Sequence, residues 1–350
     1  MIGMARFRGV PKLGRMTDVM RARRLSPVID TPRVDAVMRR LGTERVGEPR
    51  NTAQGWRSDV VVVDSTDGKV VLKAYRPGWP LTSIEYEHAV LAELERQSFP
   101  AVRLRRTSTG ASIIDVDGRP HVAFDYVRGI NPSSMHIAPS LRHTLLVTSA
   151  RVLARLHEAL AEFSPVGRHH TDTIGGSGHQ YLAWIDALNR MSDVPAELAG
   201  DHSELRRLAG SISRRLTEIE SELEGSSLPE TMVHGDFGLH NLIFSSPERA
   251  VVHDFELARR DRRMVDVAAV ISRLAPPLRS VFEGAYRSAS DVDRSEWDAL
   301  ALIWEEYRLR GAVRSWRNAI DSRSRIRMET AVRRVREADA VRSMQAPTGT

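Results

Sequence analysis

Cysteine is absent from this chain of 350 residues. Disulfides, a thiolate nucleophile and cysteine-ligated metal sites are therefore excluded, and any chemistry has to come from carboxylates, histidine, lysine and hydroxyl groups. Long hydrophobic runs are also missing. No segment approaches the roughly 20 apolar residues that cross a membrane, and the first residues lack the apolar core of a secretory signal. We therefore expect a cytoplasmic protein without a membrane partner.

A strong charge of one sign is missing as well. Lysine and arginine number 51 against 45 aspartates and glutamates, which leaves a formal net charge of +6. Such a balance does not require a nucleic-acid partner, and we expect none. The 41% hydrophobic content is enough for one large core or two lobes. Nothing in the composition fixes the oligomeric state.

The hydrophobic pattern changes near residue 130. Before it, two strand pairs flank the hairpin signals Asp67-Gly68 and Asp117-Gly118. The predicted strands are 58–63, 69–75, 112–115 and 121–127, with a helix over 81–97. After it, helices are predicted over 140–161, 204–223 and 297–320, around a β-like island with strands at 231–234, 241–244 and 250–255.

This order predicts an α+β fold with two lobes. Residues 1–40 form a basic N-terminal extension in this interpretation, rich in arginine and without a clear hydrophobic pattern. Residues 41–129 form an N-lobe made of an antiparallel sheet with one helix. Residues 130–345 form a mainly helical C-lobe that contains the β-like island.

Polar residues gather in the β-like island. It contains His234-Gly235-Asp236, then Asn241, and ends with Asp254. Phosphoryl transfer needs a carboxylate that orients or deprotonates a hydroxyl, and oxygen ligands for a hard metal ion. Asp236, Asn241 and Asp254 suit those tasks. Taken alone, the same residues also suit turns in which they cap the local backbone.

Lys73 lies inside an apolar strand, where a cation is unfavourable without a partner. The following helix offers Glu85 and Glu87, and Glu87 shares the apolar face of Leu91 and Leu94. We predict an ion pair between Lys73 and Glu87, the arrangement with which kinases hold the α- and β-phosphates of the nucleotide. The alternative is a solvent-facing lysine at the edge of the sheet.

Glycine-rich phosphate-binding motifs are missing. Neither a Walker motif nor Gly-x-Gly-x-x-Gly is present. Phosphate contact before the first long strand would then depend on Gly55 and on backbone amides near Ser58.

Over roughly residues 45–320, these motifs resemble in order those of the aminoglycoside phosphotransferase and choline kinase superfamily of small-molecule kinases. The matching landmarks are Lys73 with Glu87, Leu153-Ala154-Arg155-Leu156-His157, His234-Gly235-Asp236 to Asn241, and Asp254-Phe255-Glu256 with Asp266 beyond. The resemblance implies a protein-kinase-like fold and a phosphotransferase that uses ATP and Mg²⁺. It also implies a small molecule as acceptor, such as an antibiotic, a sugar, an amino alcohol or a related metabolite, phosphorylated on a hydroxyl group.

The resemblance also assigns roles to residues. Asp236 would be the catalytic base, Asn241 and Asp254 the magnesium ligands, and Lys73, held by Glu87, the phosphate clamp. His234 and His157 would be structural, and Asp266 would be a buried carboxylate that braces the catalytic loop. The hinge that binds adenine through backbone groups would contain Asp125, Tyr126 and Val127.

The nature of the acceptor is less clear from the sequence. Kinases of polycationic antibiotics are expected to present clustered acids, but the last helices of this chain are rich in arginine. The series comprises Arg308, Arg310, Arg314, Arg317, Arg323, Arg325, Arg327, Arg333, Arg334 and Arg336. We interpret it as a solvated helical face, with anion recognition as the alternative.

Other readings of the sequence remain. A nucleotide-binding pseudokinase that acts as a regulator or scaffold is the alternative function, although none of its usual losses is seen here. A protein kinase would need a longer activation segment than the stretch after Asp254 allows. His240 either touches substrate or faces solvent. His169, His170 and Asp172 are interpreted as a loop rather than as a metal site.

Overall fold

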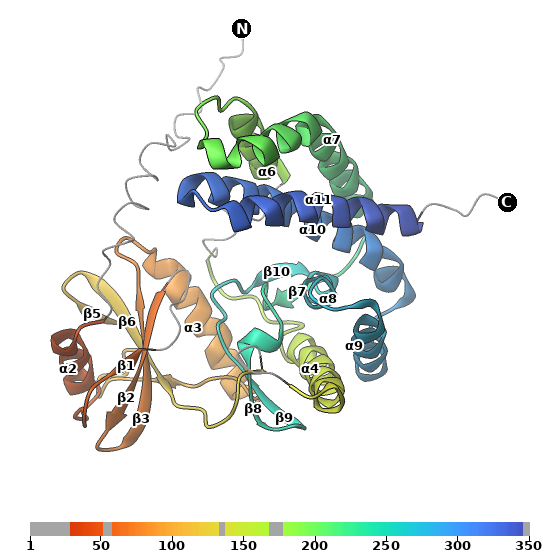
Figure 1. Ribbon diagram of the computed structural model, residues 1–350. Helices are drawn as coiled ribbons and strands as arrows, with labels where there is room; N and C mark the ends of the chain where they lie inside the picture. Colours follow the sequence, from red (N-terminus) through yellow and green to blue (C-terminus); the bar gives the residue numbers. More distant parts are fainter. Residues whose placement is uncertain (1–28, 52–57, 133–136, 168–177, 346–350) are drawn as a thin grey trace, which may run out of the picture.

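The computed structural model describes residues 29–51, 58–132, 137–167 and 178–345. These residues form two lobes, a smaller one built on an antiparallel sheet and a larger helical one (Figure 1). This is the α+β, protein-kinase-like architecture that the sequence predicts. Within the described residues, no helix combines the length and apolar character that crossing a bilayer requires.

The N-lobe sheet has six strands in the order β1-β2-β3-β6-β4, with β5 paired to β6. The strands are β1 (Arg50–Asn51), β2 (Ser58–Ser65), β3 (Gly68–Tyr75), β4 (Leu104–Arg105), β5 (Ile114–Val116) and β6 (Arg119–Asp125). All pairings are antiparallel. The two hairpins predicted from Asp-Gly signals are present, whereas β1 and β4 are too short to leave a periodic signal in the sequence.

Alternation along β3 decides which way Lys73 points. Val70, Leu72 and Ala74 lie on the face of the sheet that packs against helix α2 (Thr31–Arg40). Successive side chains of a strand point to opposite faces. Lys73 therefore points to the other face, toward helix α3 (Leu81–Arg96) and the C-lobe.

Helix α2 corrects the expectation that residues 31–40 belong to a basic extension and that the N-lobe has one helix. Asp30 caps the helix by accepting a hydrogen bond of 3.0 Å from the N–H of Arg33. Val34, Val37 and Met38 then share one face and are buried against the sheet. Three apolar residues at helical spacing are enough to dock a short helix, even among arginines.

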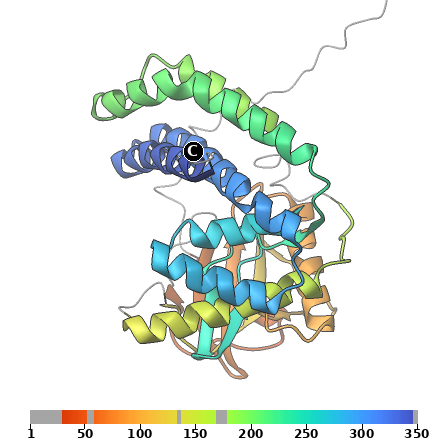
Figure 2. The ribbon, with the colours of Figure 1, turned by 90° about the vertical axis from the view of Figure 1, so that its right-hand side faces the viewer.

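The C-lobe consists of helices around two short antiparallel strand pairs. Its helices are α4 (Pro139–Ala159), α6 (Gly178–Asn189), α7 (Ala199–Glu224), α8 (Met264–Ile271), α9 (Pro276–Ala289), α10 (Arg294–Ser322) and α11 (Arg325–Gln345), with 3₁₀ turns η3 (Ala196–Leu198) and η4 (Leu239–Asn241). The strand pairs are β7 (Glu230–Val233) with β10 (Arg259–Arg262), and β8 (Leu242–Ser246) with β9 (Arg249–Val252). Figures 1 and 2 show α6 and α7 above α10 and α11, with α8, α9 and α4 below them.

The predicted strand over 250–255 extends past the C-terminal end of the observed strand. Strand β9 ends at Val252, and Asp254 adopts a left-handed backbone with φ of 65°. This conformation is rare for a residue with a side chain and ends the ladder. It places Asp254 at a bend directly after the hairpin.

Two segments of the chain lie against the β8–β9 hairpin, the connection from α3 to β4 within the N-lobe and the connection from β6 to the C-lobe. On one side, the N–H of Val102 donates to the carbonyl of Val252 (3.0 Å), and the N–H of Val252 donates to Pro100 (2.9 Å). On the other side, Ile130 and Phe244 exchange backbone hydrogen bonds of 2.9 and 2.8 Å. The hairpin is thus held between the chain that leaves α3 and the chain that leaves β6.

Candidate active site

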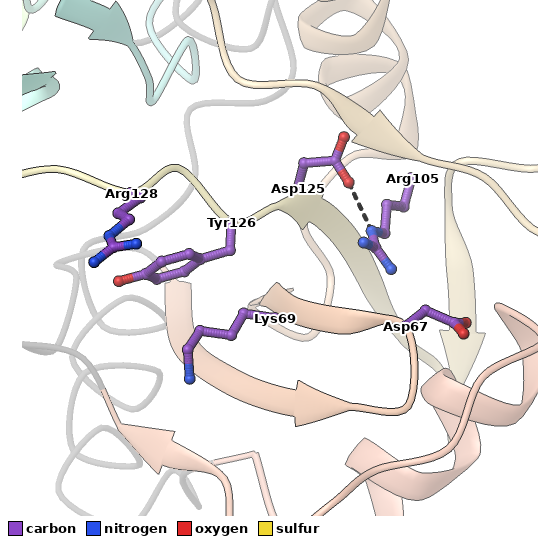
Figure 3. Close-up of a pocket in the computed structure, with 6 residues that line it drawn as sticks. All are labelled: Asp67, Lys69, Arg105, Asp125, Tyr126 and Arg128. Carbon is purple, nitrogen blue, oxygen red and sulfur yellow. Dashed lines mark hydrogen bonds and ion pairs between the residues drawn. The ribbon is translucent and has the colours of Figure 1, made fainter. Parts of the chain in front are cut away.

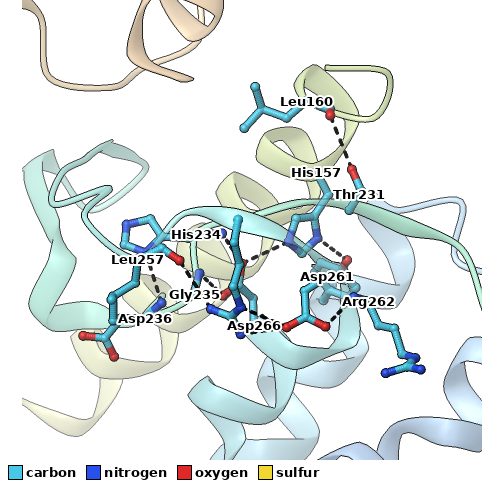
Figure 4. A network of polar contacts seen from close by, with 12 residues as sticks. His157, Leu160, Thr231, His234, Gly235, Asp236, Leu257, Asp261, Arg262 and Asp266 are labelled. Carbon is cyan, nitrogen blue, oxygen red and sulfur yellow. Dashed lines mark hydrogen bonds and ion pairs between the residues drawn. The ribbon is translucent and has the colours of Figure 1, made fainter. Parts of the chain in front are cut away.

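The loop that contains Asp236 follows β7 and enters β8 through η4. Gly235 has a φ of +80°, and a Cβ added there would lie 2.2 Å from the carbonyl oxygen of Leu257. Only glycine fits this position without a shift of the backbone. The carboxylate of Asp266 accepts hydrogen bonds from the N–H groups of His234 (2.7 Å) and Gly235 (2.9 Å), as Figure 4 shows. The predicted bracing of this loop by Asp266 is therefore confirmed.

Asp266 is itself held by a helix from elsewhere in the C-lobe. It is fully buried, and Nε2 of His157 on α4 donates to its Oδ2 over 3.2 Å (Figure 4). Burial raises the pKa of Asp266, but the hydrogen bond and charge of His157 outweigh it and keep the pKa below its ordinary value. His157 was predicted to serve in helix packing, and it is buried, but it also orients this carboxylate.

His234 joins the loop to the strand end that carries Asp254. Its Nε2 donates to the carbonyl of His253 (3.0 Å), and its Nδ1 accepts from the N–H of Asp236 (3.3 Å). The ring is fully buried and packs on Phe255 with a centroid distance of 4.8 Å. These contacts use both ring nitrogens, in agreement with the structural role expected for His234.

The carboxylate of Asp236 is engaged on both oxygens. Nη2 of Arg273 donates to Oδ1 (2.7 Å), and Nε2 of His240 donates to Oδ2 (3.2 Å). Burial raises the pKa of Asp236, but His240 and Arg273 outweigh it and hold the pKa well below its ordinary value. About a third of the Asp236 side chain stays exposed (34%). His240 was expected either to touch the substrate or to face solvent. The structure shows instead that it binds Asp236, the predicted base.

Asn241 and Asp254 lie at one end of the β8–β9 hairpin, where the N–H of His253 donates to the carbonyl of Asn241 (3.1 Å). The amide nitrogen of Asn241 donates to the carbonyl of Asp236 (3.0 Å), which identifies its oxygen as the atom free to bind a metal ion. Burial raises the pKa of Asp254, but Lys73 and His253 outweigh it, so the pKa lies below its ordinary value. Two such oxygen donors fit Mg²⁺.

Lys73 is almost completely buried and faces three carboxylates. Its Nζ lies 3.3 Å from Glu87, 3.4 Å from Asp254 and 2.7 Å from Glu256. Burial lowers the pKa of Lys73, but Glu256 and Glu87 outweigh it and hold the pKa well above its ordinary value. The predicted pair with Glu87 is present, and the alternative of a solvent-facing lysine is wrong.

Glu87 shows that this cluster has more negative charge than Lys73 balances. Burial raises the pKa of Glu87 to about 7, even though Lys73 lowers it and the Tyr75 hydroxyl donates a hydrogen bond of 2.7 Å. The negative charge of Glu256 contributes to this rise in the pKa. A divalent cation bound beside Asp254 would reduce this surplus.

Ser58 opens β2, directly after the stretch expected to cover the nucleotide. Its hydroxyl donates to Oε1 of Glu256 (3.2 Å), so β2 is tied to the Lys73 cluster through this glutamate. Several predicted features lie outside the described residues: Gly55, residues 1–28 of the basic extension, and His169, His170 and Asp172.

The predicted hinge residues follow the end of β6. The N–H of Asp125 donates to the carbonyl of Arg103 (3.0 Å), and its carboxylate accepts from Nε of Arg105 (2.7 Å). Tyr126 is 41% exposed and Val127 is half-buried. A surface pocket of about 630 Å³ lies here, lined by Asp67, Lys69, Arg105, Asp125, Tyr126 and Arg128. Figure 3 shows the Asp125 side chain directed to Arg105.

The sequence matches a known family of enzymes. The model of the phosphotransferase enzyme family matches residues 50–303. The chain belongs to this family. The phosphotransferase is 24% identical over 276 residues to a homoserine kinase of Bradyrhizobium sp. (strain ORS 278), an alignment that covers 75% of this chain and 78% of the relative.

Solved structures support the fold of the phosphotransferase. A microcompartment-associated aminopropanol kinase superposes with a TM-score of 0.65 at 20% identity, covering 88% of this chain and 95% of that one. A spectinomycin phosphotransferase in complex with ADP and spectinomycin gives a TM-score of 0.62 at 12% identity, covering 90% and 99%. These likenesses establish the two-lobed fold.

Three polar partners in the phosphotransferase were not assigned from the sequence. Arg273 binds Asp236 across a separation of 37 residues, and Glu256 binds Lys73 although only its place in a motif was noted. Tyr75 binds Glu87. The one available signal was the carboxylate of Glu256 two positions after Asp254, since alternate residues of an extended segment can reach the same site.

Proposed function

We propose that this phosphotransferase transfers the γ-phosphoryl group of ATP, together with Mg²⁺, to a hydroxyl group of a small molecule. The observation that supports this most is the link made by His234. It joins the loop of Asp236 to the strand end of Asp254, so that a carboxylate for the acceptor and the Lys73 cluster share one site.

The N-lobe side holds the nucleotide in this proposal. Lys73 binds the α- and β-phosphates, and Glu87 keeps its ammonium group in place. Asn241 and Asp254 would hold Mg²⁺ through their side-chain oxygens, and the ion would neutralise charge on the β- and γ-phosphates. The backbone of Asp125, Tyr126 and Val127 contacts the adenine, and Gly55 and Ser58 cover the phosphates.

Asp236 acts on the acceptor. It takes the proton of the acceptor hydroxyl as that oxygen forms a bond to the γ-phosphorus, while the bond from phosphorus to the β–γ bridging oxygen breaks and ADP leaves with the electron pair. Arg273 and His240 orient the carboxylate before the acceptor arrives. The names of the relatives, homoserine kinase and aminopropanol kinase, support a small hydroxylated metabolite as the acceptor.

The test is a measurement of ADP release by purified protein with ATP and Mg²⁺ against a panel of amino alcohols, hydroxy-amino acids, sugars and antibiotics. Acceptor-dependent release that Asp236→Asn abolishes supports the proposal. Asp186→Asn, which alters an exposed carboxylate on α6, is the matched control and keeps full activity. Silence across the panel, with MgATP still bound, would favour the pseudokinase alternative.

A further inference from the structure

Arginines from three helical segments lie near Arg273, which itself contacts Asp236. We name the arginine cluster by its members: Arg273, directly after α8; Arg308 and Arg314, on α10; and Arg334, on α11. Helix α10 packs against both α8 and α11. The cluster therefore occupies the C-lobe side of the site, where the acceptor of the proposed reaction has to lie in order to reach Asp236.

The contacts of the cluster hold the arginines together. Arg308 is almost completely buried and donates to the carbonyl of Ser272, the residue before Arg273. Arg334 donates to the carbonyl of Gly311 (2.8 Å) and to the hydroxyl of Ser315 (3.1 Å), both on α10. A Cβ on Gly311 would lie 2.8 Å from the Arg334 guanidinium. Arg308 and Arg334 are thus part of the packing between helices, which contradicts a purely solvated face.

Carboxylates balance only half of this charge. Within the described part of the chain, Arg273 pairs with Asp236 (2.7 Å) and Arg308 with Glu337 (2.8 Å), whereas Arg314 and Arg334 have no carboxylate within ion-pair distance. Burial, together with the positive charges of Arg314, Arg308 and Arg273, lowers the pKa of Arg334 to about 10. The buried Nε of Arg308 has no hydrogen-bond partner among the described residues. An anion bound near Arg334 would reduce the unbalanced positive charge.

Arg273 is the member that a small molecule can reach. Its side chain is 41% exposed and that of Asp236 is 34% exposed, whereas the side chain of Arg308 is only 9% exposed. Arg273 is anchored by hydrogen bonds to the carbonyls of Ala269 (2.9 Å) and Phe237 (3.3 Å). A guanidinium group presents several donors in a plane and binds carboxylate or phosphate through two of them.

We propose that the arginine cluster recognises an anionic group of the acceptor, and that Arg273 turns from Asp236 to this group when the acceptor binds. The inference rests on the proposed kinase function and adds the charge of its acceptor. Polycationic acceptors such as aminoglycosides are disfavoured.

Matched pairs of acceptors test the charge directly. Homoserine differs from 3-aminopropan-1-ol, threonine from 1-aminopropan-2-ol, and serine from ethanolamine by one carboxylate. Glycerol 3-phosphate and glycerol form the corresponding phosphate pair and separate the two kinds of anion. We expect kcat/KM for the anionic member of at least one pair to be ten or more times that of its partner. Equal rates, or faster turnover of the amino alcohols, would overturn the inference and leave the kinase function standing.

Variants of Arg273 test whether this residue discriminates between the two members of an acceptor pair. Arg273→Gln should reduce the preference to about onefold through a higher KM for the anionic acceptor, with little change in the KM for ATP. Arg273→Lys should keep part of the preference. Arg294→Gln, which removes a side chain that is 91% exposed, is the control. A preference that survives in Arg273→Gln, or a change confined to the KM for ATP, would contradict the assignment.

Binding separates this inference from the proposed function. Calorimetry with each pair in the presence of Mg²⁺ and ADP does not depend on turnover, and thermal melts verify that each variant is folded. Tighter binding of an anionic member, lost in Arg273→Gln, supports the inference even if no acceptor of the panel is phosphorylated. If neither member of any pair binds more tightly than the other, the inference is wrong whatever the outcome of the activity assay.

Discussion

The two sides of the active site carry unbalanced charges of opposite sign. On the N-lobe side, one ammonium group, that of Lys73, faces Glu87, Asp254 and Glu256. On the C-lobe side, Asp236 lies between Arg273 and His240, with further arginines behind them. Each surplus is complementary to what that side receives in the proposed reaction, a metal ion in one case and an anionic acceptor in the other. The residual charge of a site can therefore indicate its ligand before any ligand is seen.

The largest effect is expected for Asp236→Asn, which acts on the acceptor side alone. We expect kcat to fall by about 10²- to 10⁴-fold, because the amide cannot take the proton of the hydroxyl. The affinity for ATP, measured by calorimetry, should change little, since in the described part of the chain Asp236 forms ion pairs with Arg273 and His240 and not with the Lys73 cluster. A large loss of ATP affinity would show that the two sides are not separate.

Lys73→Met tests the N-lobe side. The substitution leaves Glu87 and Glu256 buried without a cation, and breaking a buried ion pair costs about 3–5 kcal/mol of the free energy of unfolding. The KM for ATP should rise and kcat should fall. Chemical denaturation and steady-state kinetics measure the two effects. The double variant Lys73→Met with Glu256→Gln should recover part of the stability and none of the activity. If it recovers no stability, the loss in Lys73→Met does not come from unpaired negative charge.

Asp266→Asn tests the support beneath the catalytic loop. The amide can accept only one of the two hydrogen bonds from His234 and Gly235 through its oxygen, and a buried hydrogen bond to a charged group contributes about 1.5–3 kcal/mol. We expect stability to fall by about that amount and kcat to fall without a matching change in the KM for ATP. Unchanged stability would mean that the loop is held mainly by its neighbours.

His88 gives the smallest effect and reports on the charge near Lys73. Burial and the charge of Lys73 together lower its pKa to about 3, whereas the unfolded chain has an ordinary pKa of about 6.5. Between these values the unfolded state binds more protons, so stability falls as the pH drops below 6.5. The loss from this group at pH 6 is about 0.8 kcal/mol and grows as the pH falls further. His88→Gln should flatten the pH dependence of the free energy of unfolding; an identical slope would contradict this origin.

Local patterns in the sequence predict most of the fold. The Asp-Gly turns and the helical periods identify the hairpins and long helices because those signals are local. Helix α2 was missed although Asp30, Val34 and Val37 carry a cap and an apolar face, because the surrounding arginines dominate the composition. The bend at Asp254 was missed because nothing in the neighbouring residues requires a positive φ.

The candidate site was predicted less evenly. The pair of Lys73 and Glu87 follows from periodicity, because a strand and the next helix fix both faces. The contact between Arg273 and Asp236 depends instead on how α8 packs against the loop, and no spacing rule connects them. For the same reason the arginines of α10 and α11 looked solvated in the sequence: the pattern of a single helix does not show which face a neighbouring helix covers.

The attachment of α3 to the hairpin limits how the lobes move. The chain after α3 pairs with β9 through Val102 and Pro100, while Glu87 lies nearer the other end of the helix. The C-terminal end of α3 is therefore fixed by backbone hydrogen bonds to the hairpin that lies between the predicted metal ligands. The part of the helix that carries Glu87 can tilt away from Lys73 only if α3 bends or the hydrogen bonds between this segment and β9 break. Amide exchange at Val102 and Val252 would then rise in step with any outward swing of the helix.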